Sequence, residues 1–293
     1  MKLIRKGSTG EKVRQIQRHL DITVDGIFGD KTERAVMQFQ HKNVLVTDGI
    51  VGPKTWAVMF GLTTDVQESL GSTHGIDINN HMLPRGEYLP GPTQKEWLFI
   101  HHTAGWHNPY RTIDHWSGDN RGRIATEFVI GGPSIYNNDF QYDGDIVRCL
   151  PDGAYAWHLG RNGEHTMHTN SVGIEVCNFG YLKDGRTYAG STVHEDQIVE
   201  LDKKFKGYKF WHKYSDAQIE ALRRLILFIA DRDNIDVRKG LPELIKQYGA
   251  RAFEWNEDAY YGRIKGLWSH SNTNKGKSDM FPQENLLTML TEL

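Results

Sequence analysis

Apolar residues recur with helical spacing along roughly the first sixty residues of the chain. In residues 11–20, positions i, i+3, i+4 and i+7 form one face of an amphipathic helix. These positions hold Val13, Ile16, Gln17 and Leu20. A second helical run covers residues 32–41, and a third follows Thr55. The pattern predicts a small all-α bundle of three helices over residues 1–62.

An eight-residue block occurs twice in this region, as D-G-I-F-G-D-K-T at 25–32 and as D-G-I-V-G-P-K-T at 48–55. Each block contains Asp-Gly and a second glycine, which is typical of a tight turn with positive φ. Each ends in a threonine before a helical run, where the threonine or the residues before it can cap the helix.

Residues 2–62 resemble the three-helix peptidoglycan-binding domain family. The shared features are the opening G-x-x-G at 7–10, the two D-G-x-x-G turns and the Phe39-Gln40 pair, in the same order. The resemblance implies a shallow groove that binds the glycan or the stem peptide of the bacterial wall. It assigns no individual binding residue.

The pattern changes after residue 62. Gly, Pro and Asn interrupt residues 63–92, which predicts a linker and lead-in. Residues 93–293 then contain both short apolar runs typical of strands and longer amphipathic runs typical of helices. The expected strands are 96–101, 124–130, 145–150, 170–177 and 266–270, and the expected helices begin at 214 and 242. The sequence predicts an α+β protein, with a mixed β-sheet flanked by helices behind the small bundle.

Composition excludes several classes of protein. A net charge of −2 gives no basic field for nucleic acid. Two cysteines cannot form a disulfide framework, and no apolar run approaches the ~20 residues of a membrane span. The first twelve residues lack the apolar core of a signal peptide. We therefore expect synthesis in a cytoplasm and no membrane insertion. We also expect the protein to be a monomer.

Five separated polar residues suggest one hydrolytic site: His101, Glu175, His270, Lys277 and Asp279. Strand ends and loops carry them, and open α/β sheets place ligands at the ends of strands. Two imidazoles and one carboxylate with an open fourth position are the pattern of catalytic zinc. A further carboxylate can serve as general base, and a lysine can stabilise an oxyanion.

Residues 93–293 resemble the zinc amidase family that includes phage lysins, wall-recycling amidases and peptidoglycan recognition proteins. The shared segments are F-I-H-H-T-A-G at 99–105, A-W-H-L-G at 156–160, N-S-V-G-I-E at 170–175, Y-x-x-A-Q at 214–218, W-S-H at 268–270 and K-S-D at 277–279. By resemblance, His101, His270 and Asp279 bind zinc, Glu175 activates water and Lys277 stabilises the oxyanion. The family often has Tyr and His where this chain has Thr126 and Glu127.

Several positions leave alternatives open. Adjacent strand residues face opposite ways, so only one of His101 and His102 can bind the metal, and the family position favours His101. His158 either contacts substrate or holds a loop. Glu127 either faces the site or is a charge on the sheet surface, and the second is favoured. Residues 180–213 form either a hairpin at the cleft rim or a surface excursion.

Cys177 shares a strand face with Glu175, which also permits a cysteine peptidase. No activating context accompanies this thiol, so an inert buried residue is the favoured interpretation.

The expected function is hydrolysis of the amide between N-acetylmuramic acid and L-alanine, with Zn²⁺ as cofactor and peptidoglycan as partner. The modular layout resembles a phage endolysin, made in the host cytoplasm and released to the wall. An effector delivered by a secretion machine would have the same features. The alternatives are a recognition protein without catalysis and a zinc peptidase that cuts within the stem peptide.

Overall fold

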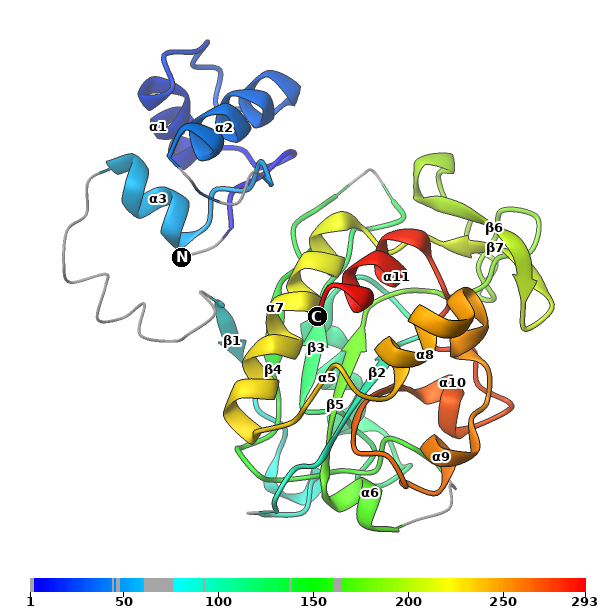
Figure 1. The fold of residues 1–293 in the computed structure, drawn as a ribbon. Helices are drawn as coiled ribbons and strands as arrows, with labels where there is room; N and C mark the ends of the chain where they lie inside the picture. The colour runs from blue at the N-terminus through cyan, green and yellow to red at the C-terminus, as the bar shows by residue number, and fades with distance from the viewer. Residues whose placement is uncertain are drawn as a thin grey trace. The chain divides into compact units, whose positions relative to one another are not determined.

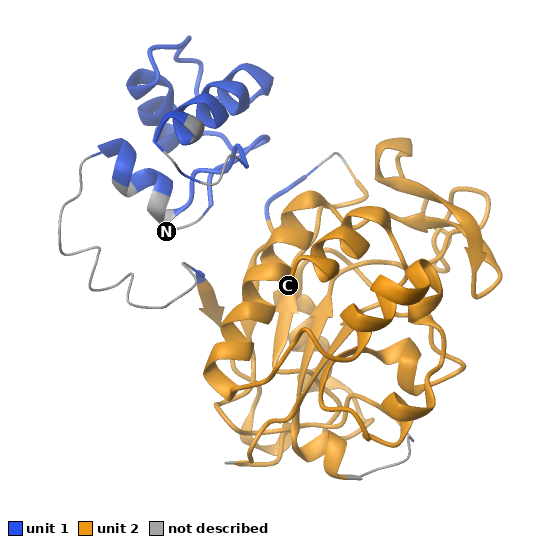
Figure 2. Ribbon diagram, in the orientation of Figure 1, with its two compact units in different colours: residues 1–77, 139–141 blue, residues 78–138, 142–293 orange. Residues whose placement is uncertain are grey.

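The computed structural model describes residues 3–43, 45, 48–60, 76–91, 93–136, 139–160 and 165–293. The chain divides into two compact units, residues 1–77 with 139–141 and residues 78–138 with 142–293 (Figure 2). Residues 63–75 and 92 of the expected linker lie outside the described residues, as do residues 61 and 62 at the end of the expected bundle. Within the described part of the chain, no helix combines the length and the apolar character needed to cross a membrane.

The first unit contains the three expected helices, α1 (Glu11–His19), α2 (Asp30–Lys42) and α3 (Pro53–Phe60) (Figure 1). Helix α2 begins two residues before Thr32, so this threonine lies in the first turn and does not precede the helix as expected. The core of the unit consists of Ile4, Val13, Ile16, Phe28, Val36, Val51 and Met59.

The side chain of Gln17 holds the first of the two repeated turns. Its Nε2 donates to Asp25 Oδ1 at 2.7 Å, to the Ile27 carbonyl at 3.0 Å and to Thr32 Oγ1 at 3.1 Å. Its Oε1 accepts from the Gly26 amide at 2.8 Å. A buried amide is stable only when its polar atoms are paired, and Gln17, 1% exposed, is fully paired within its own repeat.

Gln40 makes the same four contacts in the second repeat. Its Nε2 donates to Asp48 Oδ1, the Ile50 carbonyl and Thr55 Oγ1 at 2.7, 2.8 and 3.3 Å, and its Oε1 accepts from Gly49 N at 2.8 Å. The sequence repeat is therefore a repeat of one hydrogen-bonded unit. Thr32 and Thr55 accept hydrogen bonds from the glutamines. This role explains why a threonine recurs in each block although neither threonine caps a helix.

The second unit is built on a six-stranded sheet with the order β1-β4-β3-β5-β2-β8 (Figure 1). All neighbouring strands are parallel except β3 and β4. A separate antiparallel hairpin is formed by β6 and β7. The strands are β1 (Ile78–Asn80), β2 (Trp97–His102), β3 (Phe128–Ile130), β4 (Ile146–Arg148), β5 (Ser171–Val176), β6 (Ile198–Phe205), β7 (Tyr208–His212) and β8 (Gly266–Ser269).

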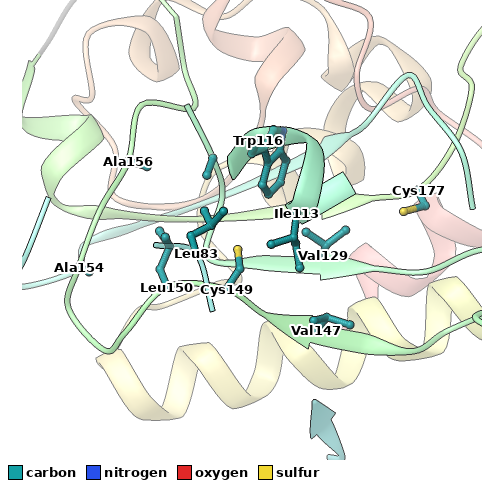
Figure 3. Close-up of a cluster of buried hydrophobic side chains, with 11 residues drawn as sticks. Leu83, Ile113, Trp116, Val129, Val147, Cys149, Leu150, Ala154, Ala156 and Cys177 are labelled. Atoms are coloured by element: carbon teal, nitrogen blue, oxygen red, sulfur yellow. The ribbon is translucent and has the colours of Figure 1, made fainter. Parts of the chain in front are cut away.

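Helices cover both faces of this sheet, which confirms the predicted fold class. An apolar cluster that includes Ile113 and Trp116 lies between α5 and the strands, and α7 lies on the other side (Figure 3). The helices are α5 (Pro109–Gly118), α6 (His165–Thr169), α7 (Asp216–Asp233), α8 (Leu241–Tyr248), α9 (Glu257–Tyr260), α10 (His270–Thr273) and α11 (Glu284–Thr291), with 3-10 helices η1 (Arg85–Glu87), η2 (Glu195–Gln197) and η3 (Gly249–Phe253).

Two strands differ from expectation. Residues 78–80, in the expected linker, form β1 and pair with β4. The strand expected at 124–130 begins only at Phe128, because the chain bends at Glu127.

The bend gives Glu127 a role that neither sequence interpretation foresaw. Its side chain is 2% exposed, so it is not a surface charge, and it does not line the cavity described below. Its carboxylate accepts from Arg232 Nη1 and Nη2 at 2.6 and 3.2 Å and lies 3.2 Å from Arg148 Nη2. The Arg232 guanidinium also lies 5.7 Å from the ring centroid of Phe128. Glu127 and Phe128 therefore both lie on the side of the sheet that α7 covers.

Replacing Gln40 with Ala should weaken the second turn. The Gly49 amide and the Asp48 carboxylate would each lose a partner, at a local cost of about 1–3 kcal/mol. Amide hydrogen exchange at Gly49 in the full chain measures this loss. Gln38→Ala, an exposed position on the same helix, is the control. Equal protection in the two variants would contradict the role of Gln40.

Replacing Arg232 with Ala should lower the free energy of unfolding by about 3–5 kcal/mol, because it leaves the buried Glu127 carboxylate short of its main partner. Arg263→Ala is the control, since this side chain is 54% exposed and its ion pairs should contribute at most about 1 kcal/mol. Denaturant unfolding of the full chain compares the two. Adding Glu127→Gln to the Arg232→Ala variant should recover part of the lost free energy of unfolding. If Arg232→Ala and Arg263→Ala lower this free energy equally, the network around Glu127 is refuted.

Candidate functional site

Three parallel strands bring the expected site residues to one edge of the sheet. His101 on β2 is in register with Glu175 on β5, and β2 also pairs with β8. His270 follows β8 directly, as the first residue of α10. Because the carboxyl ends of parallel strands meet at one edge, side chains from three distant segments share one site.

His101, His270 and Asp279 form a buried cluster that could hold a metal ion. The Nδ1 atoms of the two histidines are 3.0 Å apart, and Asp279 Oδ2 lies 2.9 Å from His270 Nδ1 and 3.4 Å from His101 Nδ1. Tetrahedral ligands at 2.0–2.1 Å from zinc are roughly 3.3 Å from each other, so the donor triangle fits such an ion. Two facing Nδ1 atoms can share only one proton between them. A metal cation can accept the lone pairs of both nitrogens, so it satisfies this pair better than a single hydrogen bond does.

The environment favours the protonation states that a metal requires. Burial lowers the pKa of His101 to about 4, so this imidazole is neutral at neutral pH. Burial alone would raise the pKa of Asp279, but His270 and His101 outweigh it and hold this pKa well below its usual value. A neutral imidazole and an ionised carboxylate are the forms that coordinate metals.

His158 supports His101 from behind the cluster. Its Nδ1 lies 3.0 Å from His101 Nε2, and its Nε2 lies 2.8 Å from Ser171 Oγ. Both ring nitrogens thus face protein groups, although the half-buried ring also lines the cavity. Contacts of this kind orient metal-binding histidines. Contact of His158 with substrate remains a prediction.

Gly173 makes the position of His158 possible. A Cβ at this residue would lie 2.6 Å from Thr126 Cγ2 and 3.1 Å from His158 Nδ1. Sequence reasoning missed Ser171 and Gly173 as parts of the site. The only signal was that both precede Glu175 on the same alternating strand face.

His102 lies on the opposite face of β2. Its Nδ1 is 2.7 Å from the Tyr214 hydroxyl, and the ring lies near Phe281. The structure therefore brings His101, and not His102, into the cluster. Tyr214 follows β7 and precedes α7, so His102 links the sheet to both elements.

Glu175 and Lys277 line the same cavity as the cluster, which has a volume of about 930 Å³. The Oε2 atom of Glu175 is buried and has no hydrogen-bond partner among the described residues. Burial, together with the Asp279 carboxylate, raises the pKa of Glu175 well above its usual value, while Lys277 opposes the shift. A carboxylate in this state is suited to accept a proton. Lys277 is exposed on the loop that leads to Asp279.

Cys177 does not belong to this cavity. It is buried, its Sγ lies 3.8 Å from Thr112 Oγ1, and burial raises the pKa of its thiol to about 12. A thiol in this state is not a nucleophile at neutral pH. The structure therefore supports the inert interpretation of Cys177.

Residues 180–213 include the hairpin of β6 and β7, one of the two forms considered for this segment. Tyr188, which precedes the hairpin, lines the cavity. At the hairpin turn, Lys206 Nζ donates to the Lys275 carbonyl at 3.0 Å. The segment thus contacts both the cavity and the loop that carries Lys277.

Comparisons with known proteins cover both units. Residues 9–59 match the peptidoglycan binding domain family, and residues 92–279 match the N-acetylmuramoyl-L-alanine amidase family. The chain is 38% identical over 68 residues to the zinc D-Ala-D-Ala carboxypeptidase of Streptomyces albus G, covering 20% of this chain and 27% of that protein. It is 23% identical over 113 residues to the N-acetylmuramoyl-L-alanine amidase CwlA of Bacillus subtilis (strain 168), covering 38% and 36%.

The chain spans only 27% and 36% of the lengths of these two curated relatives. Among solved structures, the Burkholderia AP3 phage endolysin is 34% identical with a TM-score of 0.21, covering 26% of this chain and 34% of that one. The structure of PlyL is 11% identical with a TM-score of 0.38, covering 70% and 86%. TM-scores this low do not establish a shared fold.

The amidase match spans well over half of the chain and includes all three residues of the buried cluster. It confirms the resemblance that the sequence motifs indicated: the chain belongs to the N-acetylmuramoyl-L-alanine amidase family.

Proposed function

We propose that this protein is a zinc-dependent peptidoglycan hydrolase that cleaves the amide between N-acetylmuramic acid and L-alanine. The observation that carries the proposal is the His101–His270–Asp279 triangle, which shares one cavity with Glu175 and Lys277. Membership of the amidase family gives this constellation its substrate.

The three residues of the triangle would hold zinc through two nitrogens and one oxygen. Zinc bound there supplies Lewis acidity toward the scissile carbonyl and toward water. His158 would keep His101 oriented, since it contacts the ring nitrogen that does not face the cluster.

Glu175 acts as the general base in this proposal. As a water oxygen attacks the scissile carbonyl carbon, the Glu175 carboxylate takes a proton from that water. It then gives the proton to the nitrogen of L-alanine as the C–N bond breaks. The products are the carboxylate of the muramic acid lactyl group and a stem peptide with a free amino terminus.

Lys277 stabilises the oxygen that gains negative charge during the attack. Lys277 lines the cavity, and its positive charge opposes the rise in the pKa of Glu175. A cation that faces the developing oxyanion acts selectively on the transition state.

The first unit would hold the enzyme on its polymeric substrate, given its match to a peptidoglycan binding domain. A wall-binding unit joined to an amidase unit suits an endolysin that is made in a host cytoplasm and acts on the bacterial wall. We propose that it works as a monomer.

Mass spectrometry of digested peptidoglycan tests the reaction. The expected products are free stem peptides that begin with L-alanine and glycan strands without peptide. Cleaved peptides still attached to muramic acid would identify a zinc peptidase. If the zinc-loaded protein binds the wall and releases nothing, it is a recognition protein.

Replacing Asp279 with Ala should reduce bound zinc from about one ion per chain to near zero, because one of three ligands is lost. Elemental analysis of the purified full chain measures the stoichiometry. Asp258→Ala, at a partly exposed aspartate that pairs with Arg263, should keep its zinc. Unchanged zinc in the Asp279 variant would refute this ligand assignment.

Replacing Glu175 with Gln should leave zinc stoichiometry unchanged and lower kcat by roughly 10²–10⁴-fold, because the amide cannot accept the proton. Release of stem peptides over time measures kcat, and elemental analysis checks the metal. A variant with full zinc and more than a tenth of the activity would contradict Glu175 as the base.

A further inference from the structure

Three aromatic side chains line the cavity although they are open to solvent. Trp106, Tyr136 and Tyr188 are 43%, 50% and 64% exposed. They follow β2, β3 and β5, three strands that run parallel to each other. Their loops therefore leave the same edge of the sheet that carries His101 and Glu175.

Contacts with neighbouring groups hold these rings. The ring centroids of Trp106 and Tyr136 are 5.6 Å apart with an interplanar angle of 30°. Both Trp106 and Tyr188 contact the buried ring of Phe179, at 5.0 and 6.3 Å between centroids. The Tyr136 hydroxyl lies 2.9 Å from Ser191 Oγ, which joins two of the loops. The rings are thus anchored at one side and open at the other.

Anchored but exposed aromatic rings beside a reactive centre indicate a ligand surface. Isolated exposed rings are common in proteins, but a group of three that lines one cavity is typical of a binding groove. The cavity volume of about 930 Å³ lies at the upper end of the range for ligand sites. It leaves room for groups beyond the scissile amide.

We propose that Trp106, Tyr136 and Tyr188 form a stacking subsite for an N-acetylhexosamine ring of the glycan strand, next to the muramic acid that carries the scissile bond. This inference rests on the proposed function. A pyranose has a face of C–H groups and an edge of hydroxyls, so it buries its apolar face on an aromatic ring and leaves its polar edge in water.

The charges of the cavity favour a sugar over the peptide at this position. The cationic side chains in the lining are Arg111 on α5 and Lys277, together with Arg121, whose guanidinium also donates to the Asp119 carboxylate. These suit the carboxylates of a stem peptide. The aromatic group contains no charged side chain and suits an uncharged ring. The uncharged sugar and the charged stem peptide of a muropeptide therefore match two different sets of side chains in the cavity lining.

Kinetics on substrates that share one stem peptide but carry one, two or four sugars test the subsite. For Tyr188→Ala and Trp106→Ala, we expect KM on the four-sugar substrate to rise roughly tenfold, as the loss of one good ring contact predicts. We expect kcat to stay unchanged and KM on the one-sugar substrate to stay within about twofold. Trp106→Phe, which keeps a ring, should recover most of the loss.

Tyr248→Ala is the matched control, because Tyr248 is 51% exposed on α8 and does not line the cavity. A loss that is independent of sugar number would overturn the inference and assign the rings to the peptide. Variants that all behave like the control would also overturn the inference, because the rings would then contribute nothing to binding.

A binding measurement separates failure of the subsite from failure of the proposed function. Calorimetric titration with a peptide-free tetrasaccharide should show weaker binding to Tyr188→Ala than to Tyr248→Ala, whether or not any substrate is cleaved. If the unmodified protein cleaves no substrate but the two variants still differ in tetrasaccharide binding, the proposed reaction is wrong and the subsite stands. Equal binding to both variants would overturn the subsite.

Discussion

The parallel pairing of β2 with β5 and β8 places the groups that the proposed chemistry requires. His101 and Glu175 are in register on adjacent strands, and His270 begins the helix that follows β8. No local segment could assemble this set, because the histidines are 169 residues apart in the chain. The site therefore depends on the sheet, and a slip of one residue in β2 would exchange His101 for His102 at the cluster. The contact of His102 with Tyr214 on the opposite face favours the observed register.

Burial of polar groups is the second constraint on the site. Away from the cavity, the buried carboxylate of Glu127 is neutralised by Arg232 and Arg148. In the cavity, Oε2 of Glu175 is buried and has no hydrogen-bond partner among the described residues. Such an atom costs free energy in a folded protein. The carboxylate of Glu127 therefore stabilises the fold, whereas the carboxylate of Glu175 is available for a reaction.

Much of this arrangement could be predicted from the sequence, because short apolar runs mark the buried strands and ordered motifs mark the cluster. The rest depends on contacts that no local pattern encodes. The side of the sheet on which Glu127 lies depends on a bend at that residue and on an arginine 105 positions away. Strand β1 has the sequence Ile-Asn-Asn and is too short and polar to show alternation. The link from His158 to His101 requires Gly173, whose role is visible only once Thr126 and His158 are in place.

The two glutamine-held turns of the first unit have a consequence for how this unit can change. At Ile27, the backbone amide donates to Asp25 and the carbonyl accepts from Gln17, yet the side chain is 56% exposed. The backbone of Ile50 is held in the same way by Asp48 and Gln40. The turn is thus fixed by atoms that every amino acid except proline possesses. Substitution of the Ile27 side chain can alter the surface of the unit while its scaffold stays constant, so this position is open to diversification by evolution or by design.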